Sequence, residues 1–261
     1  MPVFEHRGVQ LHYVDSGAGD PLIFLHGLGG SSGQILSTYE PIADRRLIAP
    51  DQQAHGKSGV RWEGLGFDAL ADDVIALADR LGLQHFQLAG ISMGAAVAVD
   101  LALRHPGRLT ALALIRPAWT HLPMSDAVRH HFRICADYLR RADKEGYQAT
   151  EEYRGLSGMS AYTANAFLAN FDDPASLAHP DKFLVLPADA PFSAQEALAG
   201  IRLPTLILAN RKDMVHPFAY GAYYQRSIPG AVLLEIADKD SDPAGHKRQL
   251  NAFLSDFLER R

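Results

Sequence analysis

The segment Gly90-Ile91-Ser92-Met93-Gly94 lies between the apolar run His85–Ala89 and the small-residue run Ala95–Leu103. This order is typical of a buried strand, a sharp turn that carries the serine, and a helix that begins directly after the turn. Glycines two residues before and after Ser92 leave room for a turn in which the serine backbone is strained and its hydroxyl stands above the sheet. We therefore predict that Ser92 is a nucleophile on a strand-to-helix turn.

Short apolar runs alternate with helical patterns along much of the chain. An amphipathic helix is expected over Phe67–Leu81, and another closes the chain over Gly245–Arg261. Such alternation predicts an α/β fold whose mainly parallel sheet is covered by helices on both faces. Strands are expected at Val9–Val14, Leu22–Leu25, Leu47–Ala49, His85–Ala89, Leu109–Ile115, Thr205–Ala209 and Val232–Ile236.

The segment Pro117–Gly200 breaks this alternation. It contains helical stretches around Ala127–Arg141, Tyr147–Gly155 and Thr163–Asn170 but no convincing buried strand, and prolines and glycines punctuate it. We therefore predict one core domain, formed by residues 1–116 and 201–261, with residues 117–200 as a helical insertion.

Composition limits the partners and the compartment. The 261 residues are 47% apolar and 21% charged, with a formal net charge of −5, which is typical of one soluble globular protein. Lysine and arginine are scattered, so neither nucleic acid nor an anionic membrane is an expected partner. The expected partner is a small-molecule substrate. No apolar run approaches the roughly 18 residues of a membrane span, and the first residues lack the order of a secretory signal. The single cysteine, Cys135, is interpreted as a buried apolar residue on a helix, and a cytoplasmic location is expected.

A serine alcohol needs a base to act as a nucleophile near neutral pH, usually a histidine oriented by a carboxylate. For a serine on this kind of turn, the acid and then the histidine follow in the chain. Asp213 comes just after the expected strand Thr205–Ala209, and His246 follows Val232–Ile236 in an expected loop before the last helix. We predict that His246 is the base of Ser92 and that Asp213 orients it.

Other carboxylates compete for the role of Asp213, and the chain has eleven histidines besides His246. His216 follows Asp213 closely and is within reach of a pocket, but a histidine at the start of a helix is the simpler interpretation. His246 is preferred because of its position and its preceding glycine. The rival carboxylates lie close to His246 in the sequence, where they more often tune local charge, and they are Glu235, Asp238, Asp240 and Asp242.

Two backbone N–H groups are needed to hold a developing oxyanion, and loss of one donor typically lowers the rate on the order of a hundredfold. We expect these donors to be Met93, on the serine turn, and Leu28, in His26-Gly27-Leu28-Gly29-Gly30. The glycine spacing of that stretch is not Gly-x-Gly-x-x-Gly, so no nicotinamide or flavin is indicated. The histidines lack metal-binding spacings, and the neighbours His130 and His131 point to different helix faces, so neither a metal nor another cofactor is expected.

With these elements in place, the chain resembles the α/β-hydrolase fold superfamily over nearly its whole length. The resemblance implies an eight-stranded, mostly parallel sheet, and a cap over residues 117–200 that walls the substrate pocket. A serine in the nucleophile position disfavours the dehalogenases and epoxide hydrolases that use aspartate. Architecturally, the chain is most similar to enol-lactonases, carboxylesterases and hydrolases of ring-fission products, although such a fold does not fix the substrate. The residues that carry the resemblance are His26–Gly30, Pro50–Ser58, Gly90–Gly94, Asp213 and Gly245-His246, with Ala54-His55 departing from the usual glycine-containing pair.

Arg116 departs from the commonest members of that superfamily, because it ends the strand Leu109–Ile115 beside the entrance to the expected cap. Its side chain has two possible roles: to clamp a substrate carboxylate, or to fix the cap through an ion pair, and the second is the simpler.

The sequence thus predicts a cofactor-free serine hydrolase that cleaves a small ester, thioester or lactone through an acyl-enzyme on Ser92. Its rate is expected to fall as His246 becomes protonated. Cleavage of a carbon–carbon bond, a lyase reaction or perhydrolysis by the same residues is an alternative, as is a ligand receptor with residual hydrolysis. The substrate and the oligomeric state are left open.

Overall fold

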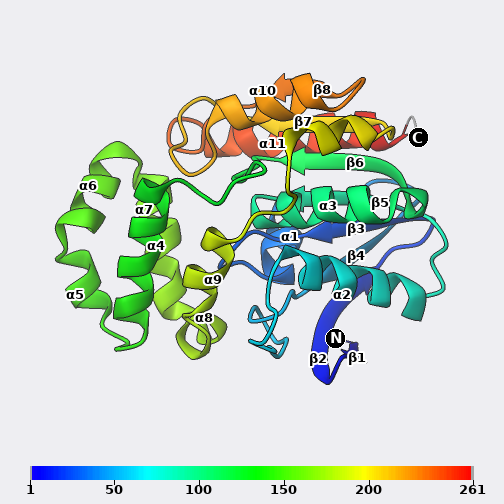
Figure 1. Ribbon diagram of the computed structural model, residues 1–261. Helices are drawn as coiled ribbons and strands as arrows, with labels where there is room; N and C mark the ends of the chain where they lie inside the picture. The colour runs from blue at the N-terminus through cyan, green and yellow to red at the C-terminus, as the bar shows by residue number, and fades with distance from the viewer. Residues whose placement is uncertain (1, 260–261) are drawn as a thin grey trace.

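One eight-stranded sheet organises residues 2–259, the part of the chain that the computed structural model describes (Figure 1). The strand order is β1-β2-β4-β3-β5-β6-β7-β8; β2 is antiparallel to β1 and β4, and the other neighbouring strands are parallel. This confirms the predicted mostly parallel eight-stranded sheet. The strands are β1 (Val3–His6), β2 (Val9–Ser16), β3 (Asp20–Leu25), β4 (Arg45–Pro50), β5 (Phe86–Ile91), β6 (Leu109–Ile115), β7 (Thr205–Ala209) and β8 (Val232–Glu235).

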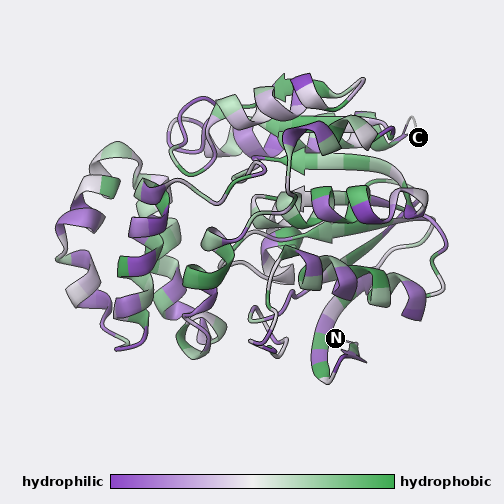
Figure 2. Cartoon of the chain, viewed as in Figure 1, coloured by the Kyte–Doolittle hydropathy of each residue, from purple (hydrophilic) through white to green (hydrophobic). Residues whose placement is uncertain are grey.

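The central strands are apolar on both faces because helices cover both sides of the sheet. Along β3, Ile23 and Leu25 join one apolar layer, whereas Leu22 and Phe24 join the other, as the two-residue repeat of a strand requires. Figure 2 shows this hydrophobic character concentrated along the strands, and more hydrophilic residues on the helices. The first layer includes residues of α2 (Phe67–Arg80), α3 (Met93–Arg104) and α10 (Phe218–Ser227); the second includes residues of α1 (Ser32–Thr38) and α11 (Pro243–Glu259).

The closing helix begins two residues earlier than the expected Gly245. It is described to Glu259, so Arg260 and Arg261 of the predicted span lie outside the described residues, as does Met1. No helix among residues 2–259 combines the length and apolarity needed to cross a membrane.

Helices alone connect β6 to β7. Figure 1 shows α4 to α9 gathered beyond the end of the sheet toward which the parallel strands point. Aromatic contacts join three of these helices: the Phe132 ring centroid lies 4.7 Å from that of Phe167 and 5.9 Å from that of Phe183. Cys135 is buried on α4, and burial raises the pKa of its thiol to about 12. The segment contains α4 (Asp126–Leu139), α5 (Lys144–Gln148), α6 (Glu151–Met159), α7 (Ala161–Ala169), α8 (Pro174–Ala178) and α9 (Lys182–Ala188), with 3-10 turns at Asn170–Asp172 and Gln195–Gly200.

Candidate active site

Ser92 stands on a sharp turn between β5 and α3, in the predicted order of strand, turn and helix. Its φ of 54° places a residue with a side chain in the left-handed region, which is a strained backbone conformation. A Cβ on Gly90 would lie 2.1 Å from the carbonyl oxygen of Gly94, and a Cβ on Gly94 would lie 2.5 Å from that of Leu25. The close backbone approach therefore requires both glycines of the motif.

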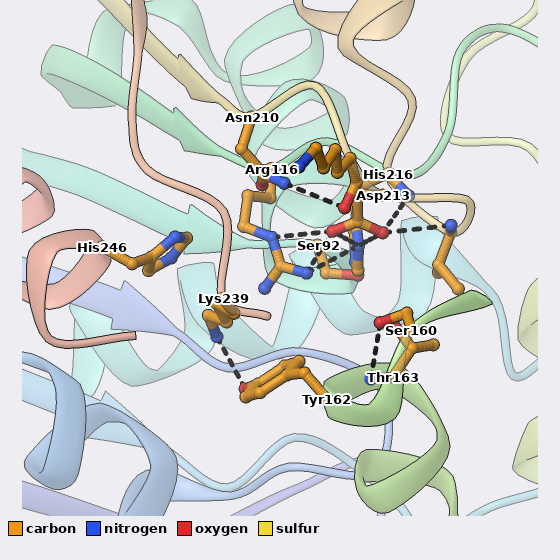
Figure 3. Close-up of polar contacts among 12 residues, drawn as sticks. Ser92, Arg116, Ser160, Tyr162, Thr163, Asn210, Asp213, His216, Lys239 and His246 are labelled. Atoms are coloured by element: carbon orange, nitrogen blue, oxygen red, sulfur yellow. Dashed lines mark hydrogen bonds and ion pairs between the residues drawn. The ribbon is translucent and has the colours of Figure 1, made fainter. Parts of the chain in front are cut away.

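The hydroxyl of Ser92 contacts a histidine that in turn contacts a carboxylate (Figure 3). Ser92 Oγ lies 2.9 Å from His216 Nε2, and His216 Nδ1 lies 2.9 Å and 3.0 Å from the two carboxylate oxygens of Asp213. With the Nδ1 proton donated to Asp213, Nε2 is free to accept the serine proton. This order of alcohol, imidazole and carboxylate is the one that activates a serine.

His246 does not contact Ser92, and the predicted partnership of these two residues is wrong. The expected loop ends earlier, because α11 begins at Pro243 and places His246 in its first helical turn. The ring is buried, with Nδ1 2.7 Å from the carbonyl oxygen of Ala237. Burial lowers the pKa of His246 to about 4. Figure 3 shows His246 well apart from the group formed by Ser92, His216 and Asp213.

Asp213 lies where the sequence places it, in the loop after β7, but it contacts His216. The backbone N–H groups of Val215 and His216 donate to Asp213 Oδ1 at 3.1 Å and 3.0 Å, so the carboxylate folds this loop back upon itself. His216 thus precedes α10 as the sequence interpretation assumed, yet its side chain turns to Ser92. The spacing of three residues between Asp213 and His216, which allows one tight turn to join them, is the signal that the sequence interpretation underused.

Arg116 contacts both Asp213 and His216. Its Nε lies 3.2 Å from Asp213 Oδ2, its Nη2 also donates to that oxygen, and Nη2 lies 3.1 Å from His216 Nδ1. The arginine and carboxylate side chains are only 7% and 4% exposed, so the ion pair is buried. The expected ion pair of Arg116 therefore exists, but its partner is Asp213 of the core and not the helical insertion.

Burial and charge act together on the two ionisable groups nearest Ser92. Burial would raise the pKa of Asp213, but His216 and Arg116 outweigh it and hold that pKa well below its ordinary value. Burial also lowers the pKa of His216; Asp213 opposes this shift and Arg116 adds to it. The histidine is consequently neutral, and able to accept a proton, at and somewhat below neutral pH.

A cavity of about 100 Å³ opens beside Ser92 between the core and the helical insertion. Leu28 lines it, and Met93 is the first residue of α3, where backbone N–H groups lack partners within the helix. Gly27 brings the loop after β3 close to Ser92, because a Cβ on Gly27 would lie 3.4 Å from Ser92 Cβ. The lining residues are Gly27, Leu28, Gln34, Ile91, Ser92, Arg116, Phe132, Tyr162, Thr163, Ala166, Phe167, Asn170, Val215, His216 and Lys239.

Among residues 2–259, no group of three or more His, Cys, Asp or Glu side chains is arranged to hold a metal ion.

A parallel sheet with a serine on its strand-to-helix turn defines a class of α/β enzymes, and comparison with known proteins identifies the family. A family model described as alpha/beta hydrolase fold matches residues 20–150. The AB hydrolase superfamily protein YisY of Bacillus subtilis is 30% identical over 271 aligned residues, which cover 95% of each chain. The chain belongs to the α/β-hydrolase fold family.

Two further proteins are similar to this chain. The putative carbamate hydrolase RutD of Rhizobium rhizogenes is 30% identical over 86% of each chain. The enol-lactonase of Burkholderia xenovorans LB400 is 20% identical and superposes with a TM-score of 0.74 over 99% of this chain and all of that one, which shows the same fold. The protein is a hydrolase of this family.

Proposed function

We propose that the protein is a cofactor-free serine hydrolase of small carboxylic esters, thioesters or lactones. Ser92 is the nucleophile, His216 its base, and Asp213 the carboxylate that orients the histidine. The observation that carries this proposal is the continuous series of hydrogen bonds from Ser92 Oγ through His216 to Asp213. His216 takes the place that the sequence interpretation gave to His246.

In the proposed reaction, Ser92 Oγ attacks the substrate carbonyl while His216 Nε2 takes the serine proton. The resulting imidazolium is stabilised by Asp213 and returns its proton to the leaving group. The backbone N–H groups of Leu28 and Met93 are the proposed donors to the oxyanion. Water, deprotonated by His216, then releases the acyl group and restores Ser92.

Residues 117–200 are the proposed cap. Phe132 of α4 and Phe167 of α7 line the same cavity as Ser92, so the helical insertion forms part of the wall of the space in which a substrate carbonyl would lie. Apolar side chains on this wall limit water at the reacting bond and strengthen the hydrogen bonds within the site.

The first test is the intact mass of the protein after exposure to a small fluorophosphonate. Wild type is expected to gain one adduct and Ser92→Ala none, because only an activated serine reacts readily with this probe. Absence of an adduct on folded wild type would contradict the proposal. Turnover of esters, thioesters, lactones, carbamates and keto acids then separates ester cleavage from carbon–carbon bond cleavage, and a single turnover without release would favour a receptor.

The pH dependence of the proposed reaction is expected to shift when Arg116 is replaced by glutamine. The nearby arginine lowers the pKa of His216, so removal of its charge raises that pKa, and a larger fraction of the base is protonated in mild acid. The acidic limb of kcat/KM for an uncharged ester should therefore move to higher pH, while glutamine retains an amide donor for Asp213. A profile that stays in place or moves to lower pH would contradict this role of Arg116.

A further inference from the structure

A second cation, Lys239, lies in the cavity that contains Ser92. It belongs to the loop between β8 and α11, and it reaches across to the helical insertion, where Nζ donates to Tyr162 Oη at 2.7 Å (Figure 3). The ammonium also lies over the ring, 4.5 Å from the Tyr162 centroid. Lysine and tyrosine therefore meet at the junction of core and insertion, on the wall of the same small space.

The charges around this cavity do not balance. Of the described residues that line it, two are cationic, Arg116 and Lys239, and none is an aspartate or glutamate. The carboxylate of Asp213 is 4% exposed and already binds Arg116 and His216. An anion in the cavity would complete the charge balance.

The neighbouring carboxylate of Asp240 is also occupied. It accepts a hydrogen bond from Ser160 Oγ at 2.6 Å and another from the backbone N–H of Tyr162 at 2.8 Å. Within residues 2–259, Lys239 accordingly has no carboxylate within ion-pair distance. Burial, with a further contribution from Arg116, lowers the pKa of Lys239 to about 7, although the charge of Asp213 opposes this shift.

We propose that Lys239 and the Tyr162 hydroxyl form a carboxylate subsite, so that the substrates are small esters, thioesters or lactones that carry a carboxylate group. This inference rests on the proposed function, because it places the scissile carbonyl of the same molecule at Ser92. Arg116 adds a positive potential beside the subsite, although two of its nitrogens are already bound to Asp213. The cavity volume of about 100 Å³ restricts the substrate to a short molecule.

Binding of diacids tests the subsite without any need for turnover. Succinate, glutarate and adipate are titrated calorimetrically into wild type, Lys239→Met and Lys57→Met, a control that replaces an exposed lysine outside the cavity. At least one diacid is expected to bind wild type and Lys57→Met equally, and Lys239→Met about tenfold to a hundredfold more weakly, the range for loss of a hydrogen bond to a charged group. Thermal unfolding of each variant verifies its fold, and Lys239→Arg should restore part of the affinity.

Equal binding to all three proteins, or no binding to any, would overturn the subsite. Inorganic phosphate that binds as tightly as the diacids would overturn its assignment to carboxylates. The ratio of kcat/KM for monomethyl succinate to that for dimethyl succinate separates the two proposals: it is expected to fall about tenfold or more in Lys239→Met. Hydrolysis of both esters at an unchanged ratio would leave the serine hydrolase intact and remove the subsite. Binding that depends on Lys239, with neither ester cleaved, would support the subsite and contradict the proposed ester hydrolysis.

Discussion

Replacement of His216 by asparagine is expected to lower kcat on the order of 10⁴-fold to 10⁶-fold, because it removes the base that takes the proton of Ser92. The asparagine amide can still donate to Asp213 from a position near that of Nδ1, but nothing replaces Nε2, which lies 2.9 Å from Ser92 Oγ. The variant should therefore fold normally and lose its reaction with a fluorophosphonate at the same time. The rate of hydrolysis measures the loss of kcat, and the rate of adduct formation measures the loss of reaction with the fluorophosphonate.

The matched control is His246→Asn. The asparagine retains a donor for the carbonyl oxygen of Ala237, the contact that His246 makes in the structure, and removes the other ring nitrogen. We expect activity within about tenfold of wild type, since no proton of Ser92 passes through this residue. The reverse pattern, with His246→Asn inactive and His216→Asn active, would show that His246 is the base and would contradict the proposed role of His216.

The serine turn was predictable because its determinants are local. Gly90 and Gly94 lack Cβ atoms, which allows the backbone of the strand, turn and helix to pack closely. The five-residue motif therefore predicts the turn without reference to distant segments. The sheet followed for a similar reason, since short apolar runs such as Leu22–Leu25 and Thr205–Ala209 coincide with buried strands. Helix boundaries in the insertion were less accurate, because side-chain caps fix them: Thr150 accepts from the N–H of Tyr153 and starts α6 there.

The histidine was assigned incorrectly because the assignment followed chain order and did not use two local signals. Pro243 is suited to the first turn of a helix, which indicates that the helix begins before His246. Asp213 and His216 stand three residues apart, which suits a tight turn joined by a carboxylate. Chain order alone favoured the later histidine, but it does not establish where a side chain points.

Contacts between distant segments were beyond the sequence. Asp240 binds the start of α7, 78 residues earlier in the chain at Tyr162, and nothing in either segment specifies the other. Arg116 is similar, because its ion pair with Asp213 spans 97 residues and forms only once β6 and β7 lie side by side. The sequence marked Arg116 as unusual, and the three-dimensional arrangement was needed to identify its partner.

Replacement of Asp213 by asparagine is expected to reduce both activity and stability. Asparagine carries no negative charge to stabilise the imidazolium of His216, and it does not fix the histidine tautomer as a carboxylate does. We therefore expect kcat to fall about 10³-fold to 10⁴-fold. It also leaves the guanidinium of Arg116, 6% exposed as a residue, without its anion. Loss of one partner from a buried ion pair lowers the free energy of unfolding by about 3 to 5 kcal/mol. Urea unfolding and ester hydrolysis measure these effects separately.

The control for stability is Asp15→Asn, which breaks a pair of the same chemistry nearer the surface. Arg46 donates from Nε and Nη2 to the two Asp15 oxygens at 2.8 Å and 2.7 Å, but these side chains are 29% and 25% exposed. Water compensates such a loss, so the expected change in the free energy of unfolding is at most about 1 kcal/mol. Equal destabilisation by the two substitutions would show that burial of the Arg116–Asp213 pair has no special energetic weight.

The pH dependence of that stability difference provides a further check on Asp213. Because the pKa of Asp213 is lowered in the folded protein, its charge stabilises the fold fully above its ordinary pKa of 3.8, and this stabilisation is lost as the pH falls further. Asparagine does not titrate. The gap between wild type and Asp213→Asn should therefore be constant near neutral pH and shrink below about pH 4. A gap that widens in acid would mean that the protonated carboxyl, and not its charge, stabilises the fold beside Arg116.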